Sequence, residues 1–571
     1  MNRQAESAYI RKCMAVMLFV LSVLLCAEAI GDEFSKNTLY VTLREPDEIA
    51  DTIPSDAVGM QTAGGKQYLF LPGNQSLEHA RVWFTGAEEI IIEDETYHSG
   101  DLWRDVMPGT KYSFKINGRT NWVTVMQGSR IPSVQILTDS RSMKKIDDSK
   151  KYKESGELLL LNENGETEYE GRLEHIKLRG NTSAKYRRKG YQIKLETKTG
   201  LLGMGKAKKW VLTSNNTDHS LLRNQITLAM ADYVGLPYTP GCVQADVYLN
   251  HQYNGTYVLQ EKIEIGKNRV DISDLEKATG EVNTEPLGSY KNRGKKQATS
   301  GEFKYMDIPN NPEDVTGGYL LEYENWPARY TDELCAYTTK RKKVISVKEP
   351  EYASLAQMEY ISSFIQGFED AIFSEDGVDP ASGKHFYEFV DLDSLALKYM
   401  LEEISRNIDG NQSSQYYYKP PDSVSTVAFA GPAWDYDCSY GDYAGKESMR
   451  NYLKPRGFSH NDRNGSRYWW PEMYKLPEFR ERVSVLWNER YMDAIAVLLG
   501  EKPGTGRIRS IDEYAAEISK SADMTFTAFP MTTSKSNLAR TGDNFEENIN
   551  FLRNYLSDRR DFLNEEWADL K

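Results

Sequence analysis

Short stretches of alternating apolar and polar residues dominate the first part of the chain. They are rich in β-branched and aromatic residues, and Pro-Gly and Asn-Gly pairs punctuate them. The five clearest are residues 39–43, 67–71, 80–84, 89–93 and 122–126. This spacing predicts a small all-β sandwich over residues 35–128. The pattern assigns no role to such a domain, because sandwiches serve both as spacers and as binding modules.

The pattern then changes to a mixture of strands and helices. Residues 173–179 and 191–195 alternate as strands, and a small polar loop at 180–185 lies between them. From residue 221 to 233 the apolar positions follow helical spacing, and Gly235 marks the end of that helix. This part of the chain therefore predicts an α+β domain.

Two more strands follow, at residues 243–249 and 256–263. The pair Asn254-Gly255 lies between them and predicts the turn of a β-hairpin. Residues 276–315 are rich in Gly, Asn, Lys and Pro and poor in apolar side chains, so we expect a mobile loop or an insertion there.

Helical spacing returns in the second half of the chain. A helix at 392–404 would present residues 407–409 just past its last turn. Residues 479–499 and 545–567 are amphipathic and predict a helical C-terminal lobe, with a looser span at 503–537 between them.

Composition narrows the classes of function. The chain has 571 residues, a formal net charge of -14 and a pI near 5.3. Its length indicates two or more domains, and its charge argues against a nucleic-acid partner. Lys and Arg nevertheless concentrate between residues 177 and 209. This local basic segment could receive an anion such as phosphate, or it could be a solvated strand face.

The N-terminus has the pattern of a secretory signal peptide over residues 1–29. Basic residues precede an apolar run at 13–26, and Ala-Glu-Ala follows at 27–29. We expect secretion or display at the cell surface, an uncleaved anchor being the alternative, and no membrane span in the mature chain.

Cysteine is sparse after the predicted cleavage site. Only Cys242, Cys335 and Cys438 remain, so at most one disulfide can form within the mature chain. This usage suits a bacterial exported protein. Neighbouring carboxylates would raise the pKa of the Cys438 thiol, so we do not expect a nucleophile there.

The most informative motif is Ala-Gly-Pro-Ala-Trp-Asp-Tyr-Asp-Cys-Ser-Tyr-Gly at residues 430–441. It places Asp435 and Asp437 directly after a strand-like run. A second acidic motif, Arg-Asn-Ile-Asp-Gly at 406–410, lies upstream, and a predicted hairpin separates the two. Kinase-type sites present their base and their Mg²⁺ ligands in this order. Caps of ordinary turns are the alternative explanation.

A longer series of motifs supports one family. The blocks are Ile-Lys-Leu-Arg-Gly-Asn (176–181), Lys-Gly-Tyr-Gln-Ile-Lys-Leu (189–195), Leu-Leu-Gly-Met (201–204), Lys-Lys-Trp-Val-Leu (208–212), Ser-Leu-Leu-Arg-Asn (220–224), Gly-Leu-Pro-Tyr-Thr-Pro (235–240), Glu-Lys-Ile-Glu-Ile-Gly-Lys-Asn-Arg-Val (261–270) and Gly-Gly-Tyr-Leu-Leu (317–321). With the two acidic motifs, this series resembles the CotH family of spore-coat-type protein kinases over residues 132–571. The preceding β-domain also resembles one often found beside this module.

The resemblance implies an atypical protein kinase-like fold that transfers phosphate from ATP to Ser or Thr of a protein substrate. The loop that includes Arg179 and Asn181 would cover the phosphates, and Lys194 would contact them. A surface position is the alternative for Lys194. Glu261 would meet adenine or pair with a basic residue in the cleft, and Arg223 would face phosphate or form a salt bridge.

The resemblance also assigns the acidic residues. Asp409 would orient the acceptor hydroxyl and receive its proton. Asp435 and Asp437 would hold Mg²⁺ or Mn²⁺, with Asn411 a further ligand, because hard cations prefer oxygen donors. Trp-Asp-Tyr-Asp stands where kinases usually have Asp-Phe-Gly, and His-Arg-Asp is absent. Which of Asp435 and Asp437 is the main ligand therefore stays open.

Two other classes of function remain beside the kinase. One is an exported kinase-like module, at the cell surface or in a spore coat, that has lost catalysis and acts by binding. The other is a glycoside hydrolase that uses Asp409 and Asp435 as its carboxylate pair, although the basic loop would then have no role. Zinc chemistry is disfavoured, because the seven His are scattered and the Cys are unpaired in sequence.

Overall fold

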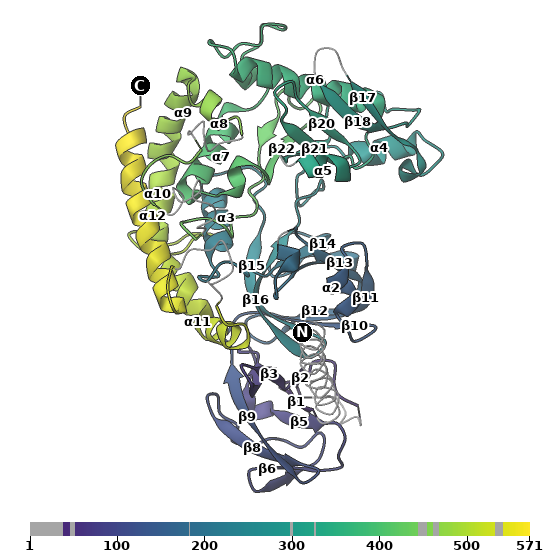
Figure 1. The fold of residues 1–571 in the computed structure, drawn as a ribbon, viewed down its shortest axis with the longest axis vertical. Coiled ribbons are helices and arrows are strands. Elements are labelled where there is room, and N and C mark those ends of the chain that lie inside the picture. The colour runs from purple at the N-terminus through teal and green to yellow at the C-terminus, as the bar shows by residue number, and fades with distance from the viewer. Residues whose placement is uncertain are drawn as a thin grey trace, which may run out of the picture.

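The computed structural model describes residues 38–45, 52–181, 183–296, 301–324, 327–442, 454–460, 468–531 and 541–570. The predicted signal peptide lies outside these residues. Three units follow one another along the long axis of the molecule: an N-terminal β-unit, a barrel, and a unit of helices around a further sheet (Figure 1). Helices and strands are both abundant, which confirms the α+β class.

The N-terminal β-unit, residues 38–127, contains two sheets over one apolar core. One sheet has the order β2(Val58–Gly59), β1(Leu39–Thr42), β5(Arg81–Phe84). The other has the order β3(Gln61–Ala63), β4(Lys66–Leu71), β9(Arg119–Gln127), β8(Lys111–Ile116), β6(Ile90–Ile92), β7(Glu95–Tyr97). Each of the five predicted strands is present, because alternation along one buried face gives a strong signal.

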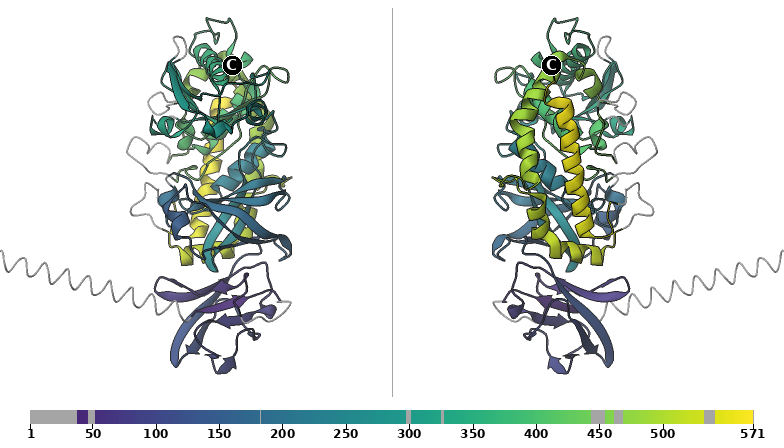
Figure 2. Two further views of the ribbon diagram at one scale, coloured as in Figure 1. Left: turned by 90° about the vertical axis from the view of Figure 1, so that its right-hand side faces the viewer. Right: turned by 90° about the vertical axis from the view of Figure 1, so that its left-hand side faces the viewer.

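The N-terminal β-unit shares its core with the barrel. Tyr248 and Tyr253 of the barrel pack in the same apolar cluster as the two sheets. The side chain of Gln61 also bonds the backbone of Tyr253 twice, at 2.8 and 3.2 Å. These contacts hold the two units against each other (Figure 2).

The barrel is closed by seven strands. Their order is β10(Ser133–Thr138), β11(Glu154–Leu161), β12(Thr167–Arg179), β13(Gly190–Thr199), β14(Ala207–Thr213), β16(Gln252–Glu261), β15(Cys242–Leu249). Alternation sends Ile176 and Leu178 into the barrel core. Lys177 and Arg179 therefore lie on the outer face.

The hairpin of β15 and β16 turns four residues earlier than the sequence predicts. The turn consists of Asn250 and His251, with φ of 49° and 69°. Two successive residues with positive φ are typical of the tight turns that match strand twist. Asn254 and Gly255 lie within β16, where the strand passes α11(Ile511–Ala528) and a Cβ on Gly255 would come within 3.5 Å of Thr525. Gly255 has a φ of 102°, and the pairing of β16 with β15 shifts register between Tyr253 and Gly255, so a bulge rather than a turn explains that glycine.

The third unit, called here the helical unit, contains a seven-stranded sheet. Its order is β17(Asn292–Lys296), β18(Glu302–Met306), β20(Ala336–Thr338), β21(Val344–Glu349), β19(Tyr319–Tyr323), β22(Gln415–Lys419), β23(Phe429–Ala430). Residues 276–315, expected to form an insertion or mobile loop, contain β17, β18 and most of α4(Leu275–Glu281). Phe303 and Met306 of β18 join the main core, so a few apolar side chains anchor this otherwise polar segment.

The helices of this unit pack around one large core. They are α3(Arg223–Tyr233), α6(Leu355–Ile372), α7(Leu392–Ser405), α8(Trp470–Met473), α9(Pro477–Leu486), α10(Met492–Leu498) and α12(Phe545–Trp567). A π-helical turn, Trp487–Tyr491, joins α9 to α10, and α12 runs along one side of the molecule (Figure 1). Among the described residues, none of the helices combines the length and apolar character that crossing a membrane requires.

The looser span expected at residues 503–537 contains the 18-residue helix α11. A capping box between Ser510 and Glu513 begins the helix. Its buried face includes Ser521 and Thr525, which bond the barrel, and these small polar residues interrupt the apolar pattern on which the prediction depended.

Candidate active site between the barrel and the helical unit

The first acidic element follows the end of α7. Arg406 caps the helix with a φ of 46°, which turns the chain sharply. Buried Asn407 then bonds in two directions. Its amide donates to the backbone carbonyl of Asp435 at 3.1 Å, and its carbonyl oxygen accepts from the backbone N–H of Asp409 at 3.2 Å. Asn407 thus connects the two acidic motifs.

The second acidic element is the loop after β23. Asp435 has a φ of 68°, a strained value for a non-glycine residue and a common feature of functional sites. Ser414 donates to its Oδ2 at 3.3 Å, and Thr217 donates to Oδ2 of Asp437 at 3.1 Å. Burial, followed by the charges of Asp435 and Asp409, raises the pKa of Asp437 to about 8. The fold therefore brings the three predicted aspartates together.

Arg179 faces these aspartates from the barrel. Its guanidinium carbon lies 5.1 Å from the centre of the Trp434 ring, and one Nη donates to the Thr213 hydroxyl at 3.4 Å. Burial lowers the pKa of Arg179, while the charges of Asp435, Tyr416 and Asp437 oppose that effect. Of the residues predicted to bind the nucleotide, Arg179 is the one that joins the acidic site.

Asn181 and Asn411 point elsewhere. Asn181 is exposed and accepts a 2.6 Å hydrogen bond from Lys150. Asn411 is buried and faces His460 and Ser459: its Oδ1 lies 2.6 Å from Nδ1 of His460, and its amide donates to the Ser459 carbonyl at 3.4 Å. The side chain of Asn411 is therefore engaged away from the loop that carries Asp435 and Asp437.

Lys194 lies on the outer barrel face at a distance from the acidic site. It pairs with Glu174 at 2.6 Å and is one-quarter exposed. Lys194 lies opposite His175 of the neighbouring strand β12. His175 precedes Arg179 by four residues, so about 13 Å of strand separates the position of Lys194 from Arg179. Lys177 shares this face and is only two residues from Arg179. No role for Lys177 was predicted from the sequence, although strict alternation within residues 176–179 places it on the same face as Arg179.

Lys209 and Lys262 extend the basic face towards the helical unit. Burial lowers the pKa of Lys262, as it does that of Lys177. The charge of Lys209, which pairs with Glu264 at 2.9 Å, lowers both of these pKa values further. The negative charge of Glu351, just beyond β21, acts in the opposite direction and raises the pKa of Lys177. This side of the barrel therefore presents a row of cations to the helical unit.

Glu261 is part of a bracket at the end of β16. Its carboxylate pairs with Arg269 at 2.7 Å and accepts from the backbone N–H groups of Gly205 and Gly241, at 3.1 and 2.9 Å. Of the two roles predicted for Glu261, the structure contains the pairing with a basic residue. A cavity of about 170 Å³ adjoins the bracket, lined in part by Lys262, Ile263 and Pro432.

A small apolar cluster joins the two units. Val211 comes from the barrel, Ile263 and Val270 come from the connecting segment, and Leu320, Tyr418 and Trp434 come from the helical unit. Such a surface beside a basic strip and an acidic loop offers the mixed chemistry that a nucleotide needs. No residue of this cluster was assigned a role from the sequence.

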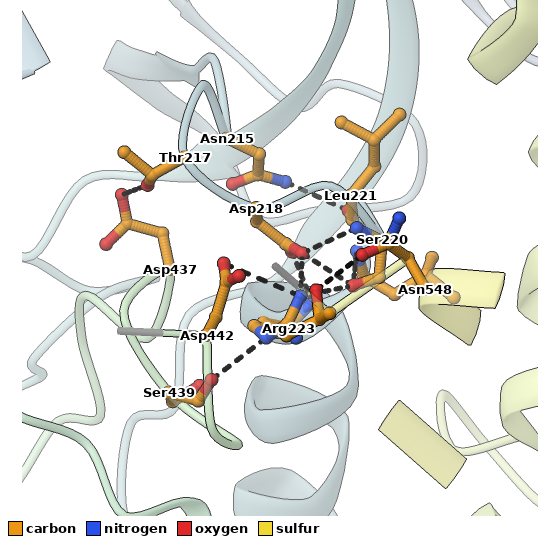
Figure 3. Close-up of polar contacts among 12 residues, drawn as sticks. Asn215, Thr217, Asp218, Ser220, Leu221, Arg223, Asp437, Ser439, Asp442 and Asn548 are labelled. Atoms are coloured by element: carbon orange, nitrogen blue, oxygen red, sulfur yellow. Dashed lines mark hydrogen bonds and ion pairs between the residues drawn. The ribbon is translucent and has the colours of Figure 1, made fainter. Parts of the chain in front are cut away.

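Arg223 lies behind the acidic loop and is completely buried (Figure 3). It bonds Asp218 through both its backbone and its guanidinium, and its Nε donates to the Ser439 carbonyl at 2.9 Å. Asp442 lies 3.7 Å from its Nη1. The predicted salt bridge within the lobe is confirmed, and it attaches α3 to the loop.

The remaining sequence predictions concern single side chains. Cys242, Cys335 and Cys438 are free thiols. Burial, with Asp437 the largest charge contribution, raises the pKa of Cys438 well above its ordinary value, which agrees with an unreactive thiol. Within the described ranges, no three or more His, Cys, Asp or Glu side chains form a group that could hold a metal ion.

Comparison with known proteins identifies a family. No curated protein matches the chain. The family model described as CotH kinase protein matches residues 176–563, which is more than half of the chain. The match includes the barrel strands from β13 to β16, both acidic motifs and most of the C-terminal helices. The chain therefore belongs to the CotH family of kinase-like proteins.

Proposed function

We propose that this protein is an ATP-dependent kinase that transfers the γ-phosphate to Ser or Thr hydroxyls of a protein substrate, with Mg²⁺ or Mn²⁺. The observation that carries the proposal is the convergence of Asp409, Asp435 and Asp437 beside a buried loop. Burial, followed by the charges of Asp435 and Asp409, raises the pKa of Asp437 to about 8. Carboxylates held this close repel one another, and a bound cation would relieve that repulsion.

The arrangement of the units supports the same function. We infer that the barrel and the helical unit are the two lobes of a kinase-like domain, residues 132–571, preceded by a β-sandwich. The acidic loop, the basic barrel face and the apolar cluster of Val211 and Leu320 then border one cleft. Adenine would pack against the apolar cluster, and the phosphates would lie towards Arg179.

The donor set suits a hard cation. Asp435 and Asp437 offer carboxylate oxygens, and the Thr217 hydroxyl is within 3.1 Å of Asp437. Magnesium is commonly held by one or two carboxylates together with substrate phosphates, so two aspartates suffice. Asn411 would have to leave His460 to join them. When bound, the metal would neutralise charge on the phosphates.

The basic residues would bind the phosphates. Arg179 is close enough to Asp435 and Asp437 for their charges to act on it. Lys177 is the nearest lysine along the same strand face, and we assign it the phosphate contact that the resemblance gives to Lys194. For Lys194 to reach the phosphates, it would have to leave Glu174 and cross roughly 13 Å of strand.

Asp409 would act on the acceptor. Its backbone is fixed by Asn407, and its Oδ1 accepts from Gln412 at 3.3 Å. The acceptor oxygen forms a bond to the γ-phosphorus as the bond to the β,γ-bridging oxygen breaks. The hydroxyl proton passes to Asp409, and ADP leaves.

Label transfer from γ-³²P-ATP tests the proposal. The protein spanning residues 30–571 would be incubated with Mg²⁺ or Mn²⁺ and a Ser-rich acceptor, with Asp435→Ala as control. We expect metal-dependent label on Ser or Thr that the control lacks. No transfer, together with no ATP-induced rise in melting temperature, would contradict the kinase and favour an exported binding module at the cell surface or in a spore coat.

A further inference from the structure

Tyr436 stands between the two proposed metal ligands, yet its side chain points into the protein core. It is completely buried. Its hydroxyl donates to Oε1 of Glu402 at 2.7 Å and accepts from Nζ of Lys398 at 2.9 Å. Lys398 and Glu402 also bond each other at 2.6 Å, one turn apart on α7. The loop that carries Asp435 and Asp437 is therefore anchored on a buried ion pair.

Glu402 also contacts the other acidic element. An added Cβ on Gly410 would come within 2.2 Å of its Oε2, so Gly410 lies directly against the carboxylate. Among the described residues Oε2 has no hydrogen-bond partner, and Oε1 accepts from both Lys398 and Tyr436. One buried carboxylate thus lies between the turn that follows Asp409 and the loop of Asp435 and Asp437.

A second anchor reaches the same residue from α3. The backbone N–H of Tyr436 donates to Oδ1 of Asn224 at 2.8 Å. The amide of Asn224 donates in turn to Oδ1 of Asn215 at 2.9 Å. Tyr436 is therefore held by its side chain on α7 and by its backbone on α3. With both ends bonded, the residue cannot rotate without breaking buried hydrogen bonds.

We propose that Tyr436 is a positioning residue, which sets the geometry of Asp435 and Asp437 through its bonds to Glu402, Lys398 and Asn224. A peptide plane on each side of Tyr436 links it to an aspartate, so a small rotation of its backbone displaces both carboxylates. Metal ligands need this kind of support from residues that do not touch the metal. The role in metal binding rests on the proposed kinase function, but the anchoring does not.

Hydrogen exchange tests the anchoring without nucleotide. Tyr436→Phe keeps the ring and removes the hydroxyl. The matched control is Tyr319→Phe, another completely buried tyrosine, whose hydroxyl donates to the Val315 carbonyl at 2.7 Å. We expect faster exchange of amides 434–440 in Tyr436→Phe and no change there in the control. Equal exchange in both variants would overturn the anchoring, whether or not the protein is a kinase.

Titration of Mn²⁺ with ADP present, followed by electron paramagnetic resonance, tests the positioning. We expect Tyr436→Phe to raise the apparent Kd for Mn²⁺ by about tenfold, because it loses the hydrogen bonds of the hydroxyl to the charged Glu402 and Lys398. Asn224→Ala should weaken binding in the same direction, because it releases the same residue from α3. The Kd of Tyr319→Phe should equal that of the wild type.

The outcomes separate the two proposals. Altered exchange with an unchanged Kd would overturn the positioning role and leave the kinase intact. If the wild type binds no Mn²⁺ with ADP, the kinase proposal and the metal-positioning role both fail, while the exchange experiment still decides the anchoring. Weaker binding in both Tyr436→Phe and Asn224→Ala supports the positioning role.

Discussion

The two walls of the proposed cleft are built in opposite ways. The acidic wall consists of Asp409, Asp435 and Asp437, and the loop that carries Asp435 and Asp437 is attached to buried residues of α3 and α7. The basic wall consists of barrel side chains, among which Lys194 pairs with the half-exposed Glu174 and Lys209 pairs with Glu264. Carboxylates are crowded together on one wall, and cations are spread along a strand face on the other.

This difference separates rigidity from adaptability. Buried bonds to charged groups are costly to break, so the acidic wall keeps its geometry before any ligand arrives. Partly exposed ion pairs contribute little free energy, so the basic wall can exchange glutamate for phosphate at small cost. A site that must hold a metal precisely and admit an anion would gain from both properties.

The largest effect is expected from the acidic wall. Asp409→Asn keeps the size of the side chain but removes the proton acceptor, so kcat should fall by about 10² to 10⁴-fold while nucleotide affinity stays within about twofold. Steady-state label transfer and an ATP-binding titration measure the two quantities. Asp139→Asn, in an exposed pair with Arg172, should keep full activity. Comparable activity in the two variants would remove Asp409 from catalysis.

The second prediction concerns the support behind that wall. Arg223→Met leaves Asp218 and Asp442 buried without their cation, and should lower the free energy of unfolding by about 3–5 kcal/mol. Urea denaturation followed by tryptophan fluorescence measures the change. The matched Arg172→Met removes an arginine from an exposed pair and should leave the midpoint nearly unchanged. Similar midpoints would mean that the acidic wall is not held by buried charge.

The third prediction is a dependence on pH. The pKa of Asp437 is raised from 3.8 to about 8, so the folded protein binds more protons than the unfolded chain in that interval. Stability should therefore fall as pH rises through it, until the folded group is ionised. Adding Mg²⁺ should raise the melting temperature more at a pH near the folded pKa of about 8 than in the middle of this pH interval, because the metal binds the ionised carboxylate. Differential scanning fluorimetry at several pH values measures both effects.

Two variants isolate the source of that slope. Asp437→Asn should reduce the slope of stability against pH and abolish the response to Mg²⁺. Burial also raises the pKa of Asp442, to about 7, which gives a slope of the same sign. Asp442→Asn should remove its own share and leave the Mg²⁺ response intact. Loss of that response in both variants would contradict a metal site limited to Asp435 and Asp437.

The smallest effects are expected on the basic wall, where two lysines can be compared directly. Lys177→Ala should raise KM for ATP by about tenfold through the loss of one charged contact to phosphate. Lys194→Ala should change KM for ATP by less than about twofold, because Lys194 pairs with the exposed Glu174 rather than with phosphate. Initial rates at varied ATP measure both. The reverse order would place the phosphates near Lys194, as the family resemblance implies.

Much of the fold was predictable because local periodicity reports one buried face. The strands of the N-terminal β-unit, α3, α7 and α12 all appear close to their predicted positions. The predictions failed where local signals were mixed. Helix α11 buries Ser521 and Thr525 rather than a clean apolar stripe, and Asn254-Gly255 lies at a bulge within β16 instead of a turn.

The sequence by itself determined the acidic motifs, their order around β22 and β23, and the family. Only the tertiary structure decided which residues meet them. Thr217 and Asn224 contact Asp437 and Tyr436 across 220 and 212 residues of chain. Strand alternation places Lys177 and Lys194 on the same face, and only the docking of the barrel decides which end of that face meets the aspartates. Contacts between distant segments depend on how whole units pack, which local patterns do not encode.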